Sequence, residues 1–271
     1  MDTGSTGPSG IGFDVTVPTT ARMYDYWLGG QDNFAADRAA ALKVEESAPG
    51  ARLMAVENRR FLQRAVRFLA QSGISQFLDI GTGLPTQGNV HEVAQAINPA
   101  ARVVYVDNDP MVLAHSRALK TGENTLVAEA DLREPEVILS QARRLLDFGQ
   151  PVAILLVAVL HFVSNDDKPG AIISTLLDAA PAGSWLVVSH VTGEFSEEGA
   201  ARSAAEYRQV TPGATVRTRE QILAFFDGLD LEEPGLVRVP EWKSEQPAEH
   251  SIRDVWFLGG AGRKDRAATR V

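Results

Sequence analysis

Short apolar segments alternate with amphipathic ones along most of the chain after residue 75. The apolar segments are Phe77–Ile80, Val103–Val106, Thr125–Ala128, Val152–Val159 and Trp185–Val188. Buried parallel strands have this continuous apolar character, and the connecting helices supply the amphipathic stretches. The pattern therefore predicts an α/β fold with a mostly parallel sheet covered by helices on both faces.

The chain departs from this alternation at both ends. Gly235–Val239 and Val255–Leu258 follow one another without a convincing helix between them, which predicts a terminal antiparallel hairpin. Residues 20–71 show helical spacing, and breaks at Leu28-Gly29-Gly30 and Pro49-Gly50 divide them into three helices. We therefore expect a disordered arm at 1–18, an N-terminal helical lid or extension at 19–75, a core at 76–260 and a flexible tail at 261–271.

A glycine-bearing turn follows the first expected strand, within the segment FLDIGTGLP at residues 77–85. A turn after a parallel strand lies at the carboxyl edge of the sheet, where ligands bind. Gly81 and Gly83 let the backbone pass close beneath a ligand, and Asp79 can accept hydrogen bonds from a ligand ammonium group or from turn amides. The third glycine of the dinucleotide fingerprint is absent, so the turn favours a cofactor without phosphate over NAD or FAD. A tight turn without any ligand is the alternative.

Acidic residues end the next two expected strands. Asp107 follows the second strand, and its carboxylate can accept hydrogen bonds from both hydroxyls of a ribose. Asp109 precedes Pro110 and has a structural explanation, as the N-cap of a helix that begins there. Asp131 follows the third strand and can accept a hydrogen bond from an adenine amino group, or can cap a helix. These strand ends predict one cofactor site.

The motifs Asp79-x-Gly81-x-Gly83, Asp107 and Ala130-Asp131 resemble the cofactor motifs of class I S-adenosylmethionine-dependent methyltransferases. Residues 21–38 (ARMYDYWLGGQDNFAADR) and 153–162 (AILLVAVLHF) are similar to an actinomycete methyltransferase family long described as a domain of unknown function. The resemblance spans nearly the whole chain and implies a Rossmann-like class I methyltransferase sheet with added N-terminal helices and with S-adenosylmethionine as cofactor. The cofactor contacts expected from the motifs and the N-terminal helices are Asp79, Gly81, Thr82, Gly83, Asp107, Asn108, Asp131, Leu132, Tyr24, Gly30 and Asn33.

The N-terminal helices are a second candidate part of the site. The segment from Tyr24 to Asn33 gathers aromatic and amide groups around a Gly29-Gly30 break, which predicts a lid; helix caps at these glycines are the alternative. An aromatic ring beside a positive sulfur adds a stabilisation of about 0.5 to 2 kcal/mol, and Tyr26 is our catalytic candidate there. His161 follows the fourth strand, where it can act as a general base or make a structural hydrogen bond.

Composition limits the class of partner. The formal net charge of −9 is spread along 271 residues and repels nucleic-acid phosphates and anionic lipid. The longest apolar run, Val152–Leu160, falls far short of the roughly 20 residues that a membrane helix requires. Cysteine is absent and the histidines lack ligand spacing, so no metal site is expected, and the composition fits a cytoplasmic protein.

The sequence therefore predicts methyl transfer to an oxygen or nitrogen atom of a small-molecule acceptor, with no nucleic-acid or membrane partner. Two other functions fit the same motifs. One is a regulator that binds S-adenosylmethionine without transferring its methyl group, and the less favoured one is an NAD-dependent oxidoreductase. These patterns specify neither the acceptor nor the oligomeric state.

Overall fold

A computed structural model of the chain describes residues 14–85, 88–118, 122–211, 213–244 and 254–265. Most of the expected arm and tail, residues 1–13 and 266–271, lies outside these ranges. Both expected boundaries differ from the structure, because residues 14–18 contact the first helix and residues 261–263 belong to the last strand. None of the helices in the described ranges has the length and apolar character needed to cross a membrane.

The sheet is mostly parallel, as predicted, and it runs in the order β3-β2-β1-β4-β5-β8-β6, with β7 also paired to β8. The five parallel strands are β1 Gln76–Ile80, β2 Arg102–Asp107, β3 Thr125–Glu129, β4 Ala153–Val157 and β5 Trp185–Val191. Three strands complete the sheet in antiparallel orientation: β6 Asp230–Leu231, β7 Val237–Arg238 and β8 Phe257–Arg263. The antiparallel pairing of β7 with β8 confirms the expected terminal hairpin, and the two-residue strand β6 adds to it.

Alternate residues of the parallel strands pack into two separate apolar cores. Phe77 and Val103 pair in register and face a core formed with α3 Ala51–Gln71, α4 Val90–Gln95 and α5 Pro110–Ala118. Leu78 and Val104 are the next pair and face a core formed with α6 Pro135–Ala142, α7 Pro169–Asp178 and α9 Arg219–Leu223. Period-two alternation thus explains why runs that are apolar at every position form the strands of a sheet covered on both faces.

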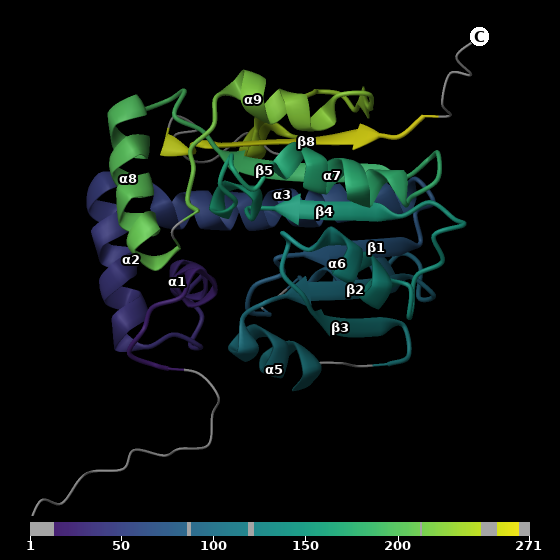
Figure 1. Cartoon of the computed structure of the whole chain (residues 1–271), viewed down its shortest axis with the longest axis horizontal. Coiled ribbons are helices and arrows are strands. Elements are labelled where there is room, and N and C mark those ends of the chain that lie inside the picture. The colour runs from purple at the N-terminus through teal and green to yellow at the C-terminus, as the bar shows by residue number, and fades with distance from the viewer. Residues whose placement is uncertain (1–13, 86–87, 119–121, 212, 245–253, 266–271) are drawn as a thin grey trace, which may run out of the picture.

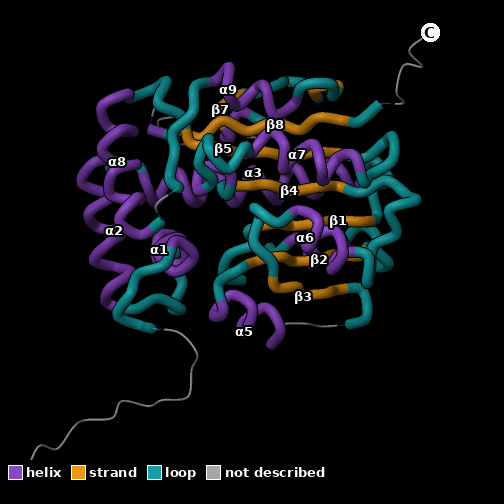
Figure 2. The backbone as a smooth tube through the Cα atoms, viewed as in Figure 1, coloured by secondary structure: helices purple, strands orange, loops and turns teal. Residues whose placement is uncertain are grey.

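Helices α1 Thr20–Trp27, α2 Ala35–Ser47 and α8 Glu197–Val210 lie beyond the carboxyl ends of the parallel strands (Figure 1). With α3, helices α1 and α2 are the three N-terminal helices that the sequence predicted. In Figure 2 the loops that follow the parallel strands lie on the side of α1 and α8. Within the described ranges lie the short 3-10 helices η1 Leu160–Phe162, η2 Ala224–Phe226 and η3 Val239–Glu241, and η1 follows β4 at this edge.

A buried ion pair joins the two first helices. Arg22 Nε lies 3.0 Å from Asp37 Oδ1, and both side chains are almost fully buried. Asp37 also accepts the backbone N–H groups of Thr19 and Phe34, and the Arg22 guanidinium donates to the carbonyl of Val17. The Arg22–Asp37 pair therefore forms hydrogen bonds to backbone groups that precede and follow α1, and these bonds fix residues 17–19 beside the carboxyl edge of the sheet.

Candidate active site

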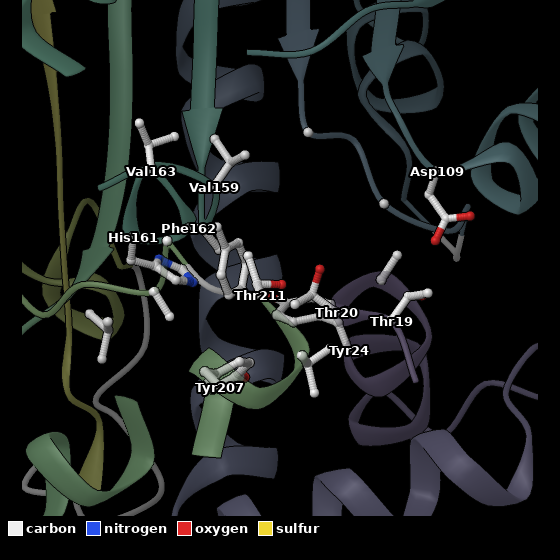
Figure 3. Close-up of a pocket in the computed structure, with 18 of the residues that line it drawn as sticks. Thr19, Thr20, Tyr24, Asp109, Val159, His161, Phe162, Val163, Tyr207 and Thr211 are labelled. Carbon is white, nitrogen blue, oxygen red and sulfur yellow. The ribbon is translucent and has the colours of Figure 1, made fainter. Parts of the chain in front are cut away.

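A cavity of about 970 Å³ opens at the carboxyl edge of the parallel strands. The ends of β1 to β4 line one side of it, and α1, α3 and α8 line the other. Figure 3 shows His161, Phe162 and Tyr207 toward one end of the cavity and Asp109 toward the other, with Thr19, Thr20 and Tyr24 between them. Pockets for one drug-sized ligand measure roughly 300 to 1,000 Å³, so this cavity lies at the upper end of that range.

The glycine turn after β1 forms part of the cavity wall. Gly81 and Gly83 have positive φ values of 72° and 65°, where residues with a side chain are strained. A Cβ on Gly81 would overlap the side chain of Val159, whereas a Cβ on Gly83 would meet no protein atom within 4 Å. Thus Gly81 allows the turn to pack against the loop after β4, and Gly83 leaves open space beside the backbone.

Asp79 lies at the base of this turn, almost completely buried. Burial raises the pKa of its carboxyl group to about 6, although the hydrogen bond from Thr82 and the positive charge of Arg59 both lower it. Thr82 Oγ1 donates to Asp79 Oδ2 across 3.0 Å. A buried carboxylate with a raised pKa at a cavity wall is typical of a site that receives a positively charged group.

Asp107 holds the glycine turn from the end of β2. Its Oδ2 accepts the backbone N–H of Gly83 at 2.9 Å, and its Oδ1 accepts that of Asp109 at 2.9 Å. Burial raises the pKa of Asp107, and these backbone hydrogen bonds lower it. The backbone N–H of Asn108 contributes as well, and since a carboxylate has about four acceptor positions, capacity remains for a further donor.

Of the residues near Asp107, one caps a helix and others line the cavity. Asp109 Oδ1 accepts the backbone N–H of Met111, as expected for a cap of α5. Asp131 and Leu132 line the cavity with Asn108, whose side chain donates to Asp131 at 3.1 Å. The Asp131 carboxylate is also paired with Arg133, whose hydrogen bonds lower its pKa to about 2. Asp131 is therefore ionised and already strongly engaged on the protein side.

Glu92 occupies the N-terminus of α4, the helix that follows the turn. Its Oε2 accepts the backbone N–H groups of Gly88 at 2.8 Å and Asn89 at 2.9 Å. A dinucleotide fold places a pyrophosphate on such free N–H groups. In this chain the carboxylate of Glu92 engages the N–H groups at the start of α4 in a capping box, which favours a ligand without phosphate.

Three expected site residues do not line the cavity in the described part of the chain. Tyr26 lies on another face of α1 from Tyr24, and the guanidinium of Arg52 covers its ring at 4.3 Å. Gly30 and Asn33 belong to the α1–α2 turn, where the Asp25 carboxylate accepts the Asn33 side chain at 2.8 Å. A Cβ on Gly30 would also overlap Asp25. In this structure these three residues contact other protein groups in α1 and the α1–α2 turn and lie outside the described cavity lining.

Tyr24 does line the cavity, but its hydroxyl is already committed. It donates to the carbonyl of Ala55 at 3.0 Å and accepts from Asn58 Nδ2 at 2.9 Å. The ring therefore presents an apolar edge rather than a free hydroxyl. It joins α1 to α3 on the helical side of the cavity.

His161 lies in η1 and lines the cavity, as expected for a residue after the fourth strand. Burial, with a smaller effect of Arg217, lowers its pKa to about 3, so the ring is neutral at neutral pH. Its Nδ1 is buried and has no hydrogen-bond partner in the described ranges. A group with this pKa is a poor base at neutral pH, and its chemistry is that of a neutral hydrogen-bonding ring.

Sequence reasoning missed Arg59, Asn58 and Tyr207, which also line the cavity. The helical spacing of Ala51, Ala55 and Arg59 on α3 contained the signal, because residues four apart share a helix face. Arg59 Nη2 donates to Asn89 Oδ1 at 3.3 Å, and its charge acts on Asp79. No cluster of three or more potential metal ligands occurs within the described ranges.

Comparisons with known proteins agree with this geometry. A family model described as S-adenosyl methyltransferase matches residues 8–265. A solved DUF574 family protein from Streptomyces avermitilis is 39% identical, with a TM-score of 0.89 over 93% of this chain and 99% of that one. A candidate methyltransferase from Thermobifida fusca is 43% identical, with a TM-score of 0.89 over 97% and 100% of the two chains.

More distant structures share the fold alone. The plantazolicin methyltransferase BamL, solved with a triazolic desmethyl-plantazolicin analogue and S-adenosylhomocysteine, is 11% identical, with a TM-score of 0.53 over 91% of this chain and 96% of that one. The comparison with curated proteins found no match.

Proposed function

The chain belongs to the S-adenosyl methyltransferase family, with S-adenosylmethionine as cofactor, and we propose that it transfers the cofactor's methyl group to a small-molecule acceptor bound beside His161. The observation that carries the proposal is the convergence of Asp79, Gly83 and Asp107 on one cavity. The cavity volume of about 970 Å³ leaves space for a second small molecule beside the cofactor.

The nucleoside half of the cofactor fits the end of β2. The Asp107 carboxylate lines the cavity and keeps acceptor capacity beyond its backbone hydrogen bonds, which the hydroxyls of a ribose can use. The open space beside Gly83 allows a ligand to approach the backbone, and Asn108 and Leu132 extend this wall. Because Glu92 already caps α4, the same turn disfavours the pyrophosphate of NAD.

The amino-acid half of the cofactor fits Asp79 and Arg59. These two side chains line the cavity and carry opposite charges. The methionine moiety likewise carries one positive group, its ammonium, and one negative group, its carboxylate. We assign the ammonium to Asp79 and the carboxylate to Arg59, because each pairing neutralises a charge inside the cavity.

When bound, the cofactor supplies an electrophilic methyl group, and the chain's own residues provide position and a dry environment. Residues 17–24 and α8 cover this edge of the sheet on the helical side of the cavity, which would limit the contact of bound ligands with water. His161 is neutral at neutral pH and can exchange a hydrogen bond with the acceptor. The described residues at this end of the cavity include no strong base, so an acceptor that is already nucleophilic, or that loses its proton after transfer, suits this site.

A thermal-shift comparison tests the cofactor assignment. S-adenosylhomocysteine should raise the melting temperature, because a ligand bound only by the folded state stabilises it, and NAD at equal concentration should not. Equal stabilisation by NAD would contradict the assignment.

Arg59→Ala tests the proposed contact with the methionine moiety. S-adenosylhomocysteine should bind at least about tenfold more weakly, a loss of about 1.4 kcal/mol, because a charge-assisted contact is removed. The affinity for 5′-methylthioadenosine, which lacks the amino-acid group, should not change. Arg60→Ala is the matched control, since Arg60 is exposed and pairs with Glu57. Equal weakening of both ligands would remove Arg59 from this role.

A further inference from the structure

We propose, resting on the function proposed above, that the methyl acceptor is an uncharged, mostly apolar molecule that offers one hydroxyl or N–H group to His161. The acceptor would occupy the end of the cavity away from Asp109, which we call the acceptor chamber. Its walls are Trp27, Ala55, His161, Phe162, Ala204 and Tyr207.

Aromatic rings give the acceptor chamber its apolar character. The rings of His161 and Phe162 lie 4.2 Å apart, and those of Phe162 and Tyr207 lie 5.5 Å apart. Trp27 contacts Tyr207 edge to face at 6.1 Å. Ala204 on α8 also lines the cavity, and its small side chain leaves space for a ligand of similar apolar character.

None of the six described residues that define the acceptor chamber carries a charge at neutral pH. Of the arginines on α1 and α3 that line the cavity, Arg22 is paired with buried Asp37, and the charge of Arg59 acts on Asp79. Arg217 lies close enough to lower the pKa of His161, but it does not line the cavity, and its guanidinium donates to the carbonyls of Leu160 and Val163 and to Asn165 Oδ1. A charged acceptor would lose its water without meeting an unengaged opposite charge in the chamber wall, so the chamber discriminates against it.

Polar groups beside the acceptor chamber are engaged with one another. Tyr24 and Asn58 bond to each other, and Ser203 Oγ lies 3.0 Å from Ser47 Oγ. Within the chamber itself, His161 Nδ1 is buried and has no hydrogen-bond partner in the described ranges. Burial raises the pKa of Tyr207 and lowers that of His161, so both are neutral at neutral pH.

Buried polar groups are nearly always hydrogen-bonded in folded proteins. His161 lines the chamber as a neutral ring that no hydrogen bond at Nδ1 ties to the described protein, so the ring keeps hydrogen-bonding capacity for a ligand. A neutral ring can exchange a hydrogen bond with a hydroxyl or N–H group without creating a buried charge. The neutral histidine ring and the aromatic walls together favour an uncharged, mostly apolar acceptor that carries one hydroxyl or N–H group.

Three probes that share one ring system test the proposal: 2-naphthol, 2-naphthoate and 2-naphthylmethylammonium. Each is titrated calorimetrically into the full chain saturated with S-adenosylhomocysteine at neutral pH. We expect 2-naphthol to bind at least about tenfold more tightly than either charged probe. Equal or tighter binding of a charged probe, or no binding of 2-naphthol to the saturated protein, would overturn the proposal. Failure of S-adenosylhomocysteine itself to bind would instead overturn the proposed function.

Two substitutions on α8 locate the probe. Ala204→Leu fills the acceptor chamber and should weaken 2-naphthol binding at least about tenfold, with little change in the affinity for S-adenosylhomocysteine. Ala205→Leu is the matched control, because Ala205 is exposed on the same helix. His161→Phe keeps a ring of similar size and should reduce the preference for 2-naphthol over naphthalene. An unchanged preference, or equal effects of the two leucine substitutions, would place the probe elsewhere and overturn the assignment.

Discussion

Replacing Asp79 with asparagine should make the protein more stable and a poorer binder of its cofactor. Burial raises the pKa of this carboxyl group from 3.8 to about 6. At neutral pH the group is ionised, although the folded state favours its protonated form more than the unfolded state does. Each pKa unit corresponds to about 1.4 kcal/mol, and the ionised group therefore lowers the free energy of unfolding by about 3 kcal/mol. Asp79→Asn removes this cost and keeps an oxygen that can accept from Thr82.

The stability difference between the wild type and Asp79→Asn should depend on pH with a defined sign. Because the folded pKa is raised, the folded state binds the proton more tightly than the unfolded state between 3.8 and about 6. The wild type should lose stability relative to Asp79→Asn as the pH rises through this window. The full difference of about 3 kcal/mol should be present above it and absent below it.

Urea denaturation across this pH range measures the difference in the free energy of unfolding, and calorimetry measures S-adenosylhomocysteine affinity. Affinity should fall at least about tenfold in Asp79→Asn, since the proposed partner of the ligand ammonium is lost. Asp107→Asn is the comparison, because both of its oxygens accept backbone N–H groups and an amide can accept at only one. A stability difference that is zero or independent of pH would refute the reasoning.

The other predictions concern the cofactor wall and the N-terminal helices. Asp107→Ala should weaken S-adenosylhomocysteine binding at least about tenfold by calorimetry. Asp109→Ala should mainly lower the free energy of unfolding in urea, by about 1 kcal/mol, because Asp109 caps α5. Arg22→Met leaves the Asp37 carboxylate buried and should cost about 3–5 kcal/mol in the same assay. In hydrogen exchange, S-adenosylhomocysteine should protect residues 20–27 more than 28–33; the reverse order would favour a lid centred on the glycine break.

Most of the sheet could be predicted from the sequence because its strands are buried on both faces. β4 is apolar at every position and the other four parallel strands are mostly apolar, and such runs have few alternative explanations when amphipathic segments separate them. β6 has only two residues and therefore no pattern to detect. The sequence predicted a last apolar segment that ended at Leu258, whereas β8 continues to Arg263. The difference arises because Gly259, Gly260 and Gly262 are typical of a loop. In the structure a Cβ on Gly259 would lie 2.9 Å from the ring of Phe61, so close packing explains that glycine.

The strand-end residues of the site could be predicted, whereas the helical ones mostly could not. Position after a strand places Asp79 and Asp107 at one edge whatever the side-chain details. On α1, successive residues turn by about 100°, so Tyr24 and Tyr26 face nearly opposite directions, and a local count of aromatic residues cannot separate them. Tyr207 reaches the cavity from α8, whose packing on α2 depends on tertiary contacts between distant segments.

The position of β8 in the sheet also sets an order on folding. β6 and β7 precede β8 in the chain, yet each pairs with β8. Neither can therefore join the sheet before residues 257–263 are in place. Until β8 docks, the seven residues of β5 present an unpaired apolar edge, from Trp185 to Val191. Such an edge recruits strands from other chains. During synthesis, a nascent chain in which β8 has not yet docked therefore exposes an aggregation-prone strand edge, and a chaperone would be useful in this interval.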